Sequence, residues 1–211
     1  MLSQELLIMM KYGYDFYIVA GFLAGSILFG RLIPMLFYGK DVEKESEDGN
    51  PGTFNAFVCG GVFCGILVLL ADIGKGLLPV AACARRLGMD SWKFVLVMVA
   101  PVFGHAHSIF RKGHGGKAIA VSFGVLIGLH PVSRPLLLLI GCYLLFAVVI
   151  PVKSNTRKSV YAFLLFTVLS IFTIPHRTIL LGCIVMSAIV VHKHCLKANE
   201  AFRRGEEWRL E

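Results

Sequence analysis

The stretch Asp48-Gly49-Asn50-Pro51-Gly52-Thr53-Phe54-Asn55 decides the fold, because it is a turn of small residues between an acidic run and a long apolar segment. Asn50 is a favourable N-cap residue, and Pro51 suits the first helical position, where an N–H group would have no helical partner. We therefore predict a helix from about Pro51 to Asp72. It is apolar enough for a bilayer, and its positive end would lie at the membrane surface, where backbone N–H groups bind anions.

The composition places the chain among integral membrane proteins. Of its 211 residues, 56% are hydrophobic and 16% are charged, which is more apolar surface than one soluble core can bury. The net charge of +8 lies mostly in short loops between apolar segments, as topology determinants do, so we predict membrane lipid and no nucleic acid as a partner. The six cysteines lie almost entirely within apolar runs and lack metal-ligand spacing. We therefore expect reduced core thiols, no metal and no cofactor.

Seven apolar segments predict an all-α integral membrane protein with seven transmembrane helices, some of them short against the roughly 20 residues of a full span. They cover residues 15 to 38, 54 to 72, 93 to 110, 118 to 131, 135 to 152, 158 to 174 and 178 to 195. The segment Leu77 to Gly88 is too short to cross, and its Pro79 predicts a half-helix or interfacial helix. In the first span, Gly21, Gly25 and Gly30 predict a helix-packing face.

The distribution of basic residues predicts the orientation. Gln4, Glu5 and Lys11 interrupt the first apolar residues, so we expect no signal peptide and a first span that remains as an anchor. One side of the membrane receives thirteen Lys and Arg residues, and the other side, to which we assign Lys75, receives seven. The positive-inside rule puts the richer side in the cytoplasm, with the N-terminus out and the C-terminus in. We expect residues 1–211 to form a single membrane-embedded domain.

Under this topology three positive helix ends face the cytoplasm, near Pro51, Lys117 and Arg157. The residues before them leave backbone N–H groups free or cap them, and these are Gly49-Asn50, Gly113-His114-Gly115-Gly116 and Ser154-Asn155-Thr156. Two glycine-rich turns lie beside lysines, namely Lys40, Lys112 and Lys117. Backbone donors and lysine charge together predict a cytoplasmic cradle for a phosphate or an acyl phosphate.

Five glycine motifs follow one another in a fixed order. They are Gly25-Ser26-Ile27-Leu28-Phe29-Gly30, the turn Gly49 to Asn55, Gly74-Lys75-Gly76, Gly104-His105 and Gly115-Gly116-Lys117. In order and spacing they resemble the bacterial acyl-phosphate:glycerol-3-phosphate acyltransferases, the PlsY family, over most of the chain. The resemblance implies a seven-helix protein of the bacterial cytoplasmic (inner) membrane with its active site facing the cytoplasm. It also implies transfer of a fatty acyl group from acyl phosphate to the sn-1 hydroxyl of glycerol 3-phosphate, giving lysophosphatidate for phospholipid biosynthesis.

The helix starts and the resemblance together define the candidate site. Acyl phosphate is already activated, so the acceptor hydroxyl attacks it directly while helix ends and Lys117 stabilise the developing charge. His192 lies at the negative end of the last helix, where a cation is favoured, so we expect it to contact an anion rather than act as a base. Lys117 and His192 are thus the predicted catalytic residues. The predicted substrate and phosphate contacts are Ser26, Lys40, Gly49, Asn50, Gly52, Asn55, His105, Lys112, Gly115 and Gly116.

The chain departs from the family pattern at several positions. Glu43 stands where the family usually has a basic residue, Glu47-Asp48 replaces Gly-Ser before Gly49, Ala118 replaces a glycine, and Cys195 replaces an asparagine. These departures leave open a homologue that acylates another acceptor, or a non-catalytic protein that binds acyl phosphate or lipid.

Each motif also has an ordinary interpretation. The Gly49 to Asn55 turn can be a simple helix cap, Lys117 a snorkelling lysine, and Lys40 and Lys112 topology charges. His105 can be a core imidazole. The acidic run from Asp41 to Asp48 indicates a solvated loop face or a magnesium site. A transporter has little support, because no inverted repeat of broken helices is visible.

Overall fold

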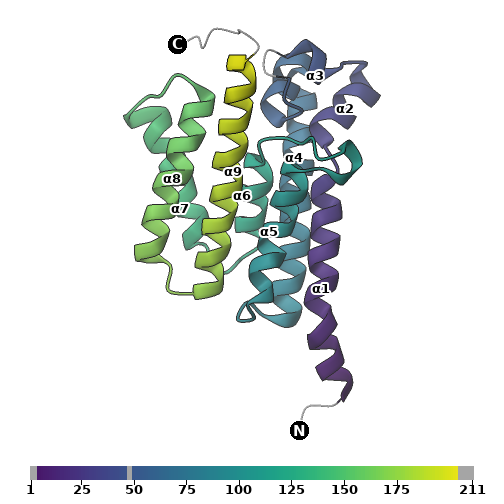
Figure 1. Ribbon diagram of the computed structural model, residues 1–211, viewed down its shortest axis with the longest axis vertical. Helices are drawn as coiled ribbons and strands as arrows, with labels where there is room; N and C mark the ends of the chain where they lie inside the picture. The colour runs from purple at the N-terminus through teal and green to yellow at the C-terminus, as the bar shows by residue number, and fades with distance from the viewer. Residues whose placement is uncertain (1–3, 47–48, 204–211) are drawn as a thin grey trace.

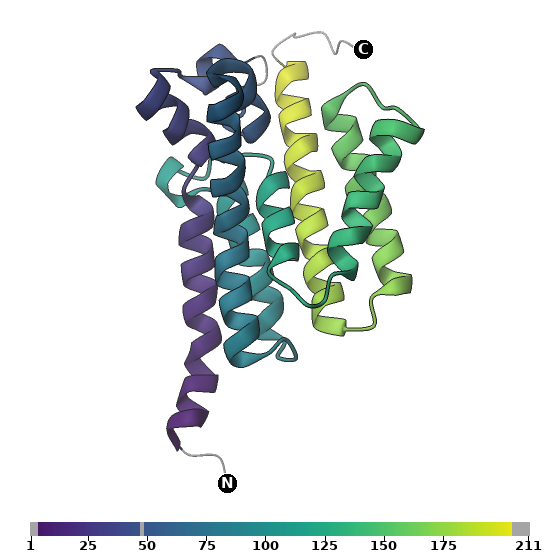
Figure 2. The same ribbon diagram turned by 180° about the vertical axis from the view of Figure 1, so that it is seen from behind.

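All elements of the chain described by the computed structural model, residues 4–46 and 49–203, are helices, and this part contains no strand. In chain order they are α1 (Gln4–Ser26), α2 (Phe29–Tyr38), α3 (Val42–Glu45), α4 (Thr53–Leu87), α5 (Lys93–Ala106), the 3-10 turn η1 (Ile109–Arg111), α6 (Ile119–Ile127), α7 (Arg134–Leu144), the π-helical turn η2 (Leu145–Val149), α8 (Asn155–Thr173) and α9 (Arg177–Arg203). The long helices run along one axis, with the two termini at opposite ends (Figures 1 and 2). The prediction of an all-α protein is confirmed.

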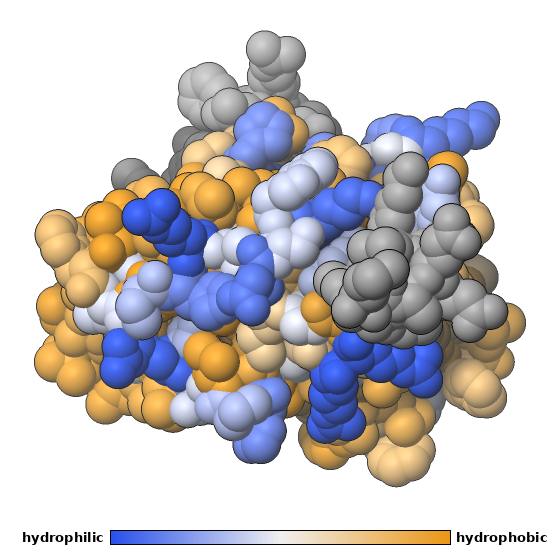
Figure 3. Space-filling model, turned by 90° about the horizontal axis from the view of Figure 1, so that it is seen from below, coloured by the Kyte–Doolittle hydropathy of each residue, from blue (hydrophilic) through white to orange (hydrophobic). Residues whose placement is uncertain are grey.

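Large apolar side chains are exposed on the outer faces of the helices, as Phe37 of α2 and Phe172 of α8 illustrate. A soluble monomer rarely exposes so much apolar surface, whereas a bilayer favours it. Three described helical segments are long and apolar enough to cross a membrane, Thr53–Leu87, Lys93–Arg111 and Arg177–Leu196, and the bent pair α1 and α2 makes a fourth. Seen from the end that carries the N-terminus, hydrophilic residues gather across the middle and hydrophobic residues lie along much of the margin (Figure 3).

The first predicted span, residues 15 to 38, is wrong as a single helix. α1 ends at Ser26, α2 begins at Phe29, and the two are bent by 46°. A break in a helix leaves carbonyl groups without partners, which other groups must satisfy. Ser108 donates its hydroxyl to the carbonyl oxygen of Ser26 at 2.6 Å, and Lys75 donates to that of Ile27 at 2.6 Å. Side chains from distant parts of the chain therefore stabilise the break.

The predicted packing face of α1 and α2 is confirmed. Gly21 and Gly25 both face Pro101 of α5, and Gly25 lies so close to the Pro101 backbone that a side chain would have no room. Gly30 lies equally close to the carbonyl oxygen of Pro51. Small residues thus allow α1 to approach α5 and α2 to approach the turn before α4.

The predicted boundary between a span at residues 54 to 72 and a half-helix at 77 to 88 is wrong. α4 continues to Leu87 through Pro79, and its one non-helical residue is Gly61, with φ 82° and ψ 177°. Gly76 lies inside the helix and does not end it. It lies against the carbonyl oxygen of Val121 in α6, where a Cβ atom would collide. The glycine makes room for a neighbouring helix instead. Lys75 is consequently buried within α4 and is not the loop charge that we predicted.

The turn before α4 is also capped differently from the prediction. The helix begins at Thr53 with Gly52 as its N-cap, so Asn50 is not the N-cap and Pro51 is not the first helical residue. The carbonyl oxygen of Asn50 accepts the Gly52 N–H and the Asn55 side-chain amide, each at 2.8 Å. These bonds close the turn on itself before the helix starts. Glu47 and Asp48 lie outside the described residues.

The later segments follow the predicted order with different lengths. α6 covers only nine of the residues predicted for its span, about 14 Å of helix against about 30 Å of hydrocarbon. α7 continues into η2, so together they cover most of residues 135 to 152. The predicted cap before α8 is confirmed, since the Ser154 hydroxyl accepts the Arg157 N–H at 3.4 Å. Phe94, Met98, Phe163 and Phe166 are fully buried in the core of this bundle.

Candidate active site

Three ionisable side chains meet in the interior where α1 breaks. Asp72 and Lys75 of α4 and His105 of α5 are 1%, 5% and 3% exposed. Lys75 Nζ lies 2.8 Å from Asp72 Oδ1, and His105 Nδ1 lies 3.9 Å from the same oxygen. Because Lys75 also donates to the Ile27 carbonyl, this buried pair connects α1, α4 and α5. A buried charge needs such partners, so the group fixes these helices relative to one another.

The glycine loop before α6 closes directly on His105. The Gly116 N–H donates to the carbonyl oxygen of His105 at 3.0 Å. Gly115 lies against the His105 and Ala106 carbonyls, and Gly116 lies against the His105 imidazole, so neither position has room for a side chain. The Gly116 N–H group is therefore already bonded within the protein. The loop holds its shape around His105.

A continuous set of contacts connects this interior group with the turn before α4. Ser26 ends α1, its hydroxyl donates to the Phe22 carbonyl at 2.8 Å, and its own carbonyl takes the hydroxyl of Ser108, three residues after His105. Beyond the break, Gly30 packs on the turn that contains Asn50, Gly52 and Asn55. The structure thus brings most of the predicted small and polar residues around the α1 break.

The predicted cations differ in exposure and in the partners that they contact. Lys117 Nζ donates to the Thr156 hydroxyl at 3.4 Å, on the side of α8. Lys40 is exposed and faces Glu45 at 3.5 Å, and Lys112 is exposed with a left-handed backbone, φ 51°. His192 is exposed on α9. Lys117 therefore contacts α8, and Lys40 contacts α3, so these two predicted cations have partners on different elements.

Sequence reasoning did not single out three charged side chains that the structure buries, Asp72, Lys75 and Lys193. Lys193 of α9 is buried as well, at 7% exposed. The available signal for Asp72 and Lys75 was their spacing of three residues, which puts opposite charges on one helix face within an apolar segment. We assigned Asp72 instead to the end of a span and Lys75 to the loop after it, because the predicted apolar segment ended at residue 72.

The acidic run forms ion pairs at the edge of this region. Glu43 Oε2 lies 2.8 Å from Arg111 and 3.2 Å from Arg31 Nε. Asp41 faces Lys44 at 3.4 Å, and Glu45 faces Lys40. The described acidic side chains from Asp41 to Glu45 therefore each have a cationic neighbour in the protein. The run is not simply the solvated loop face that the sequence indicated.

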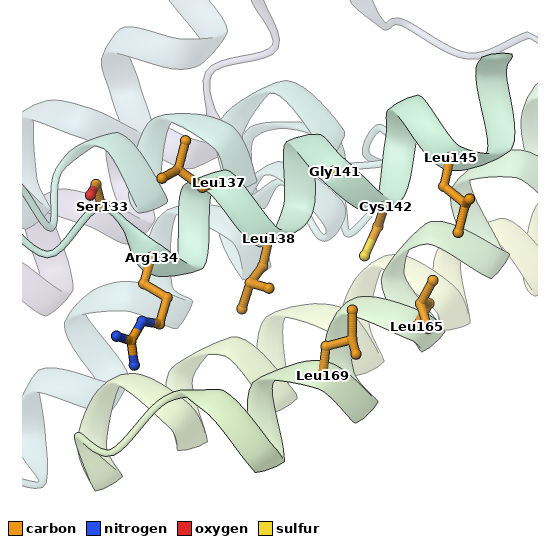
Figure 4. A pocket seen from close by; sticks show the side chains of 9 residues that line it. All are labelled: Ser133, Arg134, Leu137, Leu138, Gly141, Cys142, Leu145, Leu165 and Leu169. Atoms are coloured by element: carbon orange, nitrogen blue, oxygen red, sulfur yellow. The ribbon is translucent and has the colours of Figure 1, made fainter. Parts of the chain in front are cut away.

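An apolar cavity of ≈ 570 Å³ lies away from these groups, between α7 and α8 (Figure 4). It is lined by Ser133, Arg134, Leu137, Leu138, Gly141, Cys142, Leu145, Leu165 and Leu169. Its one charged lining residue, Arg134, donates to the Thr173 carbonyl at 2.7 Å. Its walls suit hydrocarbon, and none of the predicted site residues lines it.

Comparison with known proteins gives consistent matches. A family model described as glycerol-3-phosphate acyltransferase matches residues 16–203. A glycerol-3-phosphate acyltransferase of Pseudomonas paraeruginosa is 33% identical over 190 residues, which cover 89% of this chain and 95% of that protein. A glycerol-3-phosphate acyltransferase of Pseudomonas aeruginosa is 39% identical over 113 residues, which cover 54% of this chain and 59% of that protein.

Two solved structures share the fold. Both are crystal structures of PlsY, described as an integral membrane glycerol 3-phosphate acyltransferase, and both are 26% identical to this chain. The TM-score is 0.79 for the glycerol 3-phosphate form and 0.76 for the lysophosphatidic acid form, and the match covers 93% of this chain and 95% of PlsY. The similarity therefore extends over nearly the whole length of both proteins.

Proposed function

This chain belongs to the glycerol-3-phosphate acyltransferase family, and on that premise we propose that it transfers a fatty acyl group from acyl phosphate to the sn-1 hydroxyl of glycerol 3-phosphate. Its helices expose large apolar side chains, as expected for a protein that resembles the integral membrane protein PlsY and lies in a bilayer. The observation that supports this reaction is the meeting of separate motifs around one helix break. Gly25 to Gly30 form the break, Lys75 and Ser108 hold it, and Gly115 and Gly116 close on His105 beside it.

The proposed chemistry needs no covalent intermediate. The acceptor oxygen attacks the acyl carbonyl, a new ester C–O bond forms, and the bond between the acyl carbon and phosphate oxygen breaks. The leaving phosphate keeps that electron pair and takes the proton of the acceptor hydroxyl. Lys117, beside the positive start of α6, stabilises the charge that develops on the donor, and His192 contacts the acceptor anion. The reaction produces lysophosphatidate and inorganic phosphate.

The predicted phosphate contacts remain part of this proposal, with one change. Gly116 contributes through the shape of the loop rather than through its own N–H group, which His105 occupies. The other contacts are Ser26, Lys40, Gly49, Asn50, Gly52, Asn55, His105, Lys112 and Gly115. Because two of these residues, Lys40 and Lys112, are exposed cations, we propose that the donor and acceptor draw them toward the site when they bind.

The direct test is turnover by the purified full-length protein. Incubation with palmitoyl phosphate and glycerol 3-phosphate should give palmitoyl lysophosphatidate by mass spectrometry, together with inorganic phosphate. Lys117→Ala should lower the rate by about a hundredfold or more, the size typical of a lost group that stabilises developing charge. Lys158→Ala is the matched control, since Lys158 is a half-buried lysine in the first turn of α8 that donates to Asn155. No product from wild type, with a related enzyme active in the same assay, would overturn the proposal.

We also propose seven crossings by one domain in the bacterial inner membrane, with the N-terminus out and the site facing the cytoplasm. Cys195 is exposed near the C-terminal end of α9, and Asp90 lies in the exposed turn at the opposite end of the molecule. In spheroplasts, a membrane-impermeant maleimide should label Cys195 only after lysis. It should label Asp90→Cys, in a Cys195→Ser background, without lysis. The reverse pattern would overturn the orientation.

One observation favours a second candidate, acylation of a different acceptor. Glu43 places a carboxylate at the edge of the region assigned to phosphate, and it already occupies Arg31 and Arg111. Turnover of acyl phosphate with another alcohol or amine, and none with glycerol 3-phosphate, would support this candidate. Saturable binding of acyl phosphate without turnover on any acceptor would indicate a non-catalytic acyl-phosphate or lipid-binding protein instead.

A further inference from the structure

Two guanidinium groups from different elements converge on one carboxylate oxygen. Arg31 of α2 approaches Glu43 Oε2 through Nε at 3.2 Å, and Arg111 of η1 donates to the same atom at 2.8 Å. The three side chains are 24% to 35% exposed, so water reaches them. Two arginines around one anionic oxygen form the arrangement with which proteins bind carboxylate and phosphate groups. Here the chain's own Glu43 occupies it.

The cluster lies where the segments assigned to phosphate meet. Arg31 follows the α1 break by a few residues, and Arg111 immediately precedes Lys112 and the glycine loop. The Glu43 carbonyl lies beside Gly49, 3.4 Å from where a Cβ atom there would be. The cluster thus joins the break, the turn and the loop at their outer edge. An acceptor that enters between these segments meets Arg31 and Arg111 together with the charge of Glu43.

The neighbouring ion pairs connect residues within one segment, not residues of different elements. Lys44 pairs with Asp41 at 3.4 Å and Lys40 pairs with Glu45 at 3.5 Å, so both pairs stay within the short segment around α3. Glu43 instead reaches across to two other elements. Removing its charge therefore changes the electrostatic field between the segments, not only on the surface of α3.

We propose that Glu43 determines the charge of the acceptor that this protein accepts. Its carboxylate holds Arg31 and Arg111 as an internal anion, so an acceptor phosphate has to compete with it for these guanidinium groups and is also repelled by it. The inference deepens the proposed function and rests on it, because it assigns the acceptor to this edge. It predicts that wild type binds glycerol 3-phosphate weakly, and that loss of one negative charge improves binding.

Glu43→Gln is the test variant, because it keeps the shape of the side chain and removes its charge. We expect its KM for glycerol 3-phosphate to fall about tenfold while kcat stays within about twofold, the size expected for two partly exposed ion pairs. Asp15→Asn is the matched control. It removes one negative charge and an ion pair of 2.8 Å with Lys93, which lies toward the opposite end of the bundle, and its KM should stay within about twofold of wild type.

The outcomes separate this inference from the proposed reaction. An unchanged or higher KM in Glu43→Gln, or an equal fall in Asp15→Asn, would overturn the inference while the reaction stands. A fall in kcat with a rise in KM would show that Glu43 has a structural role, and it would overturn the inference as well. Calorimetric binding of glycerol 3-phosphate to the full chain in nanodiscs gives a readout without turnover. Tighter binding by Glu43→Gln with no lysophosphatidate from either protein would support the inference and overturn the reaction.

Discussion

The buried Asp72–Lys75 pair and the Glu43–Arg111 pair have the same N–O distance, 2.8 Å, in different surroundings. The first pair is 1% and 3% exposed at its side chains, and the second is 24% and 35% exposed. Distance alone therefore does not decide what a charge pair does. When one member of a buried ion pair is removed, water cannot solvate the charge of the other member. When the pair is partly exposed, water can solvate the remaining charge. The interior pair therefore holds the fold, whereas the outer cluster is where we propose that acceptor binding is adjusted.

The largest expected effect comes from breaking the interior pair. Lys75→Met leaves Asp72 buried without its cation and removes the donor to the Ile27 carbonyl. We expect a loss of about 3–5 kcal/mol in the free energy of unfolding and a Tm lower by about 10 °C, measured by thermal unfolding in detergent. The double variant Asp72→Asn with Lys75→Met should recover part of that loss, because no charge is left unpaired. A loss of less than about 1 kcal/mol in the free energy of unfolding of Lys75→Met would contradict the conclusion that the interior pair holds the fold.

The next effect separates the two glycines that flank Lys75. Gly76 lies against the Val121 carbonyl, while a side chain at Gly74 would meet nothing within 4 Å. Gly76→Ala should push α6 away from α4 and cost about 1–3 kcal/mol, whereas Gly74→Ala should stabilise the helix by up to about 1 kcal/mol. Thermal unfolding of both variants measures the difference. Equal shifts would mean that α4 and α6 are not in close contact at this point.

These glycines also show where sequence reasoning fails in this protein. The sequence used Gly74-Lys75-Gly76 only as a motif of the family, and the position of α6 shows that Gly76 is a packing contact. The break after Ser26 was invisible for a similar reason. Its carbonyl groups are satisfied by Lys75 and Ser108, 48 and 82 residues further along the chain from the groups they contact. Hydropathy sums over neighbouring residues and contains no information about such distant partners.

The features that the sequence did predict are those that depend on local or repeated patterns. Helical content, the packing face of Gly21 and Gly25, and the Ser154 cap follow from composition, residue size and capping chemistry, and the structure confirms them. The order of the glycine motifs identified the family, which the match over residues 16–203 confirms. The site residues themselves stay predictions, because their roles depend on bound donor and acceptor.

A smaller effect is expected on stability when the outer cluster is broken. Glu43→Gln leaves Arg31 and Arg111 in contact with water, so the free energy of unfolding should fall by less than about 1 kcal/mol, and Tm by about 2–4 °C at most. The same thermal assay used for Lys75→Met gives a direct comparison. A fall in the free energy of unfolding as large as that of Lys75→Met would mean that Glu43 is as important for the fold as the interior pair.

The smallest effect concerns salt, and it distinguishes charge from shape. Between 0.1 M and 1 M salt the screening length falls from about 10 Å to about 3 Å, which weakens exposed charges far more than buried ones. The ratio of the wild-type KM to the Glu43→Gln KM for glycerol 3-phosphate should therefore shrink from about tenfold toward about threefold. Using a ratio cancels the effect of salt on the substrate and on the other cations. The loss of stability in Lys75→Met should change little over the same range, because Asp72 is 1% exposed. A ratio that does not depend on salt would mean that Glu43 acts through the shape of the segment around α3. The Asp72–Lys75 and Glu43–Arg111 pairs would then differ in burial, but both would have a structural role.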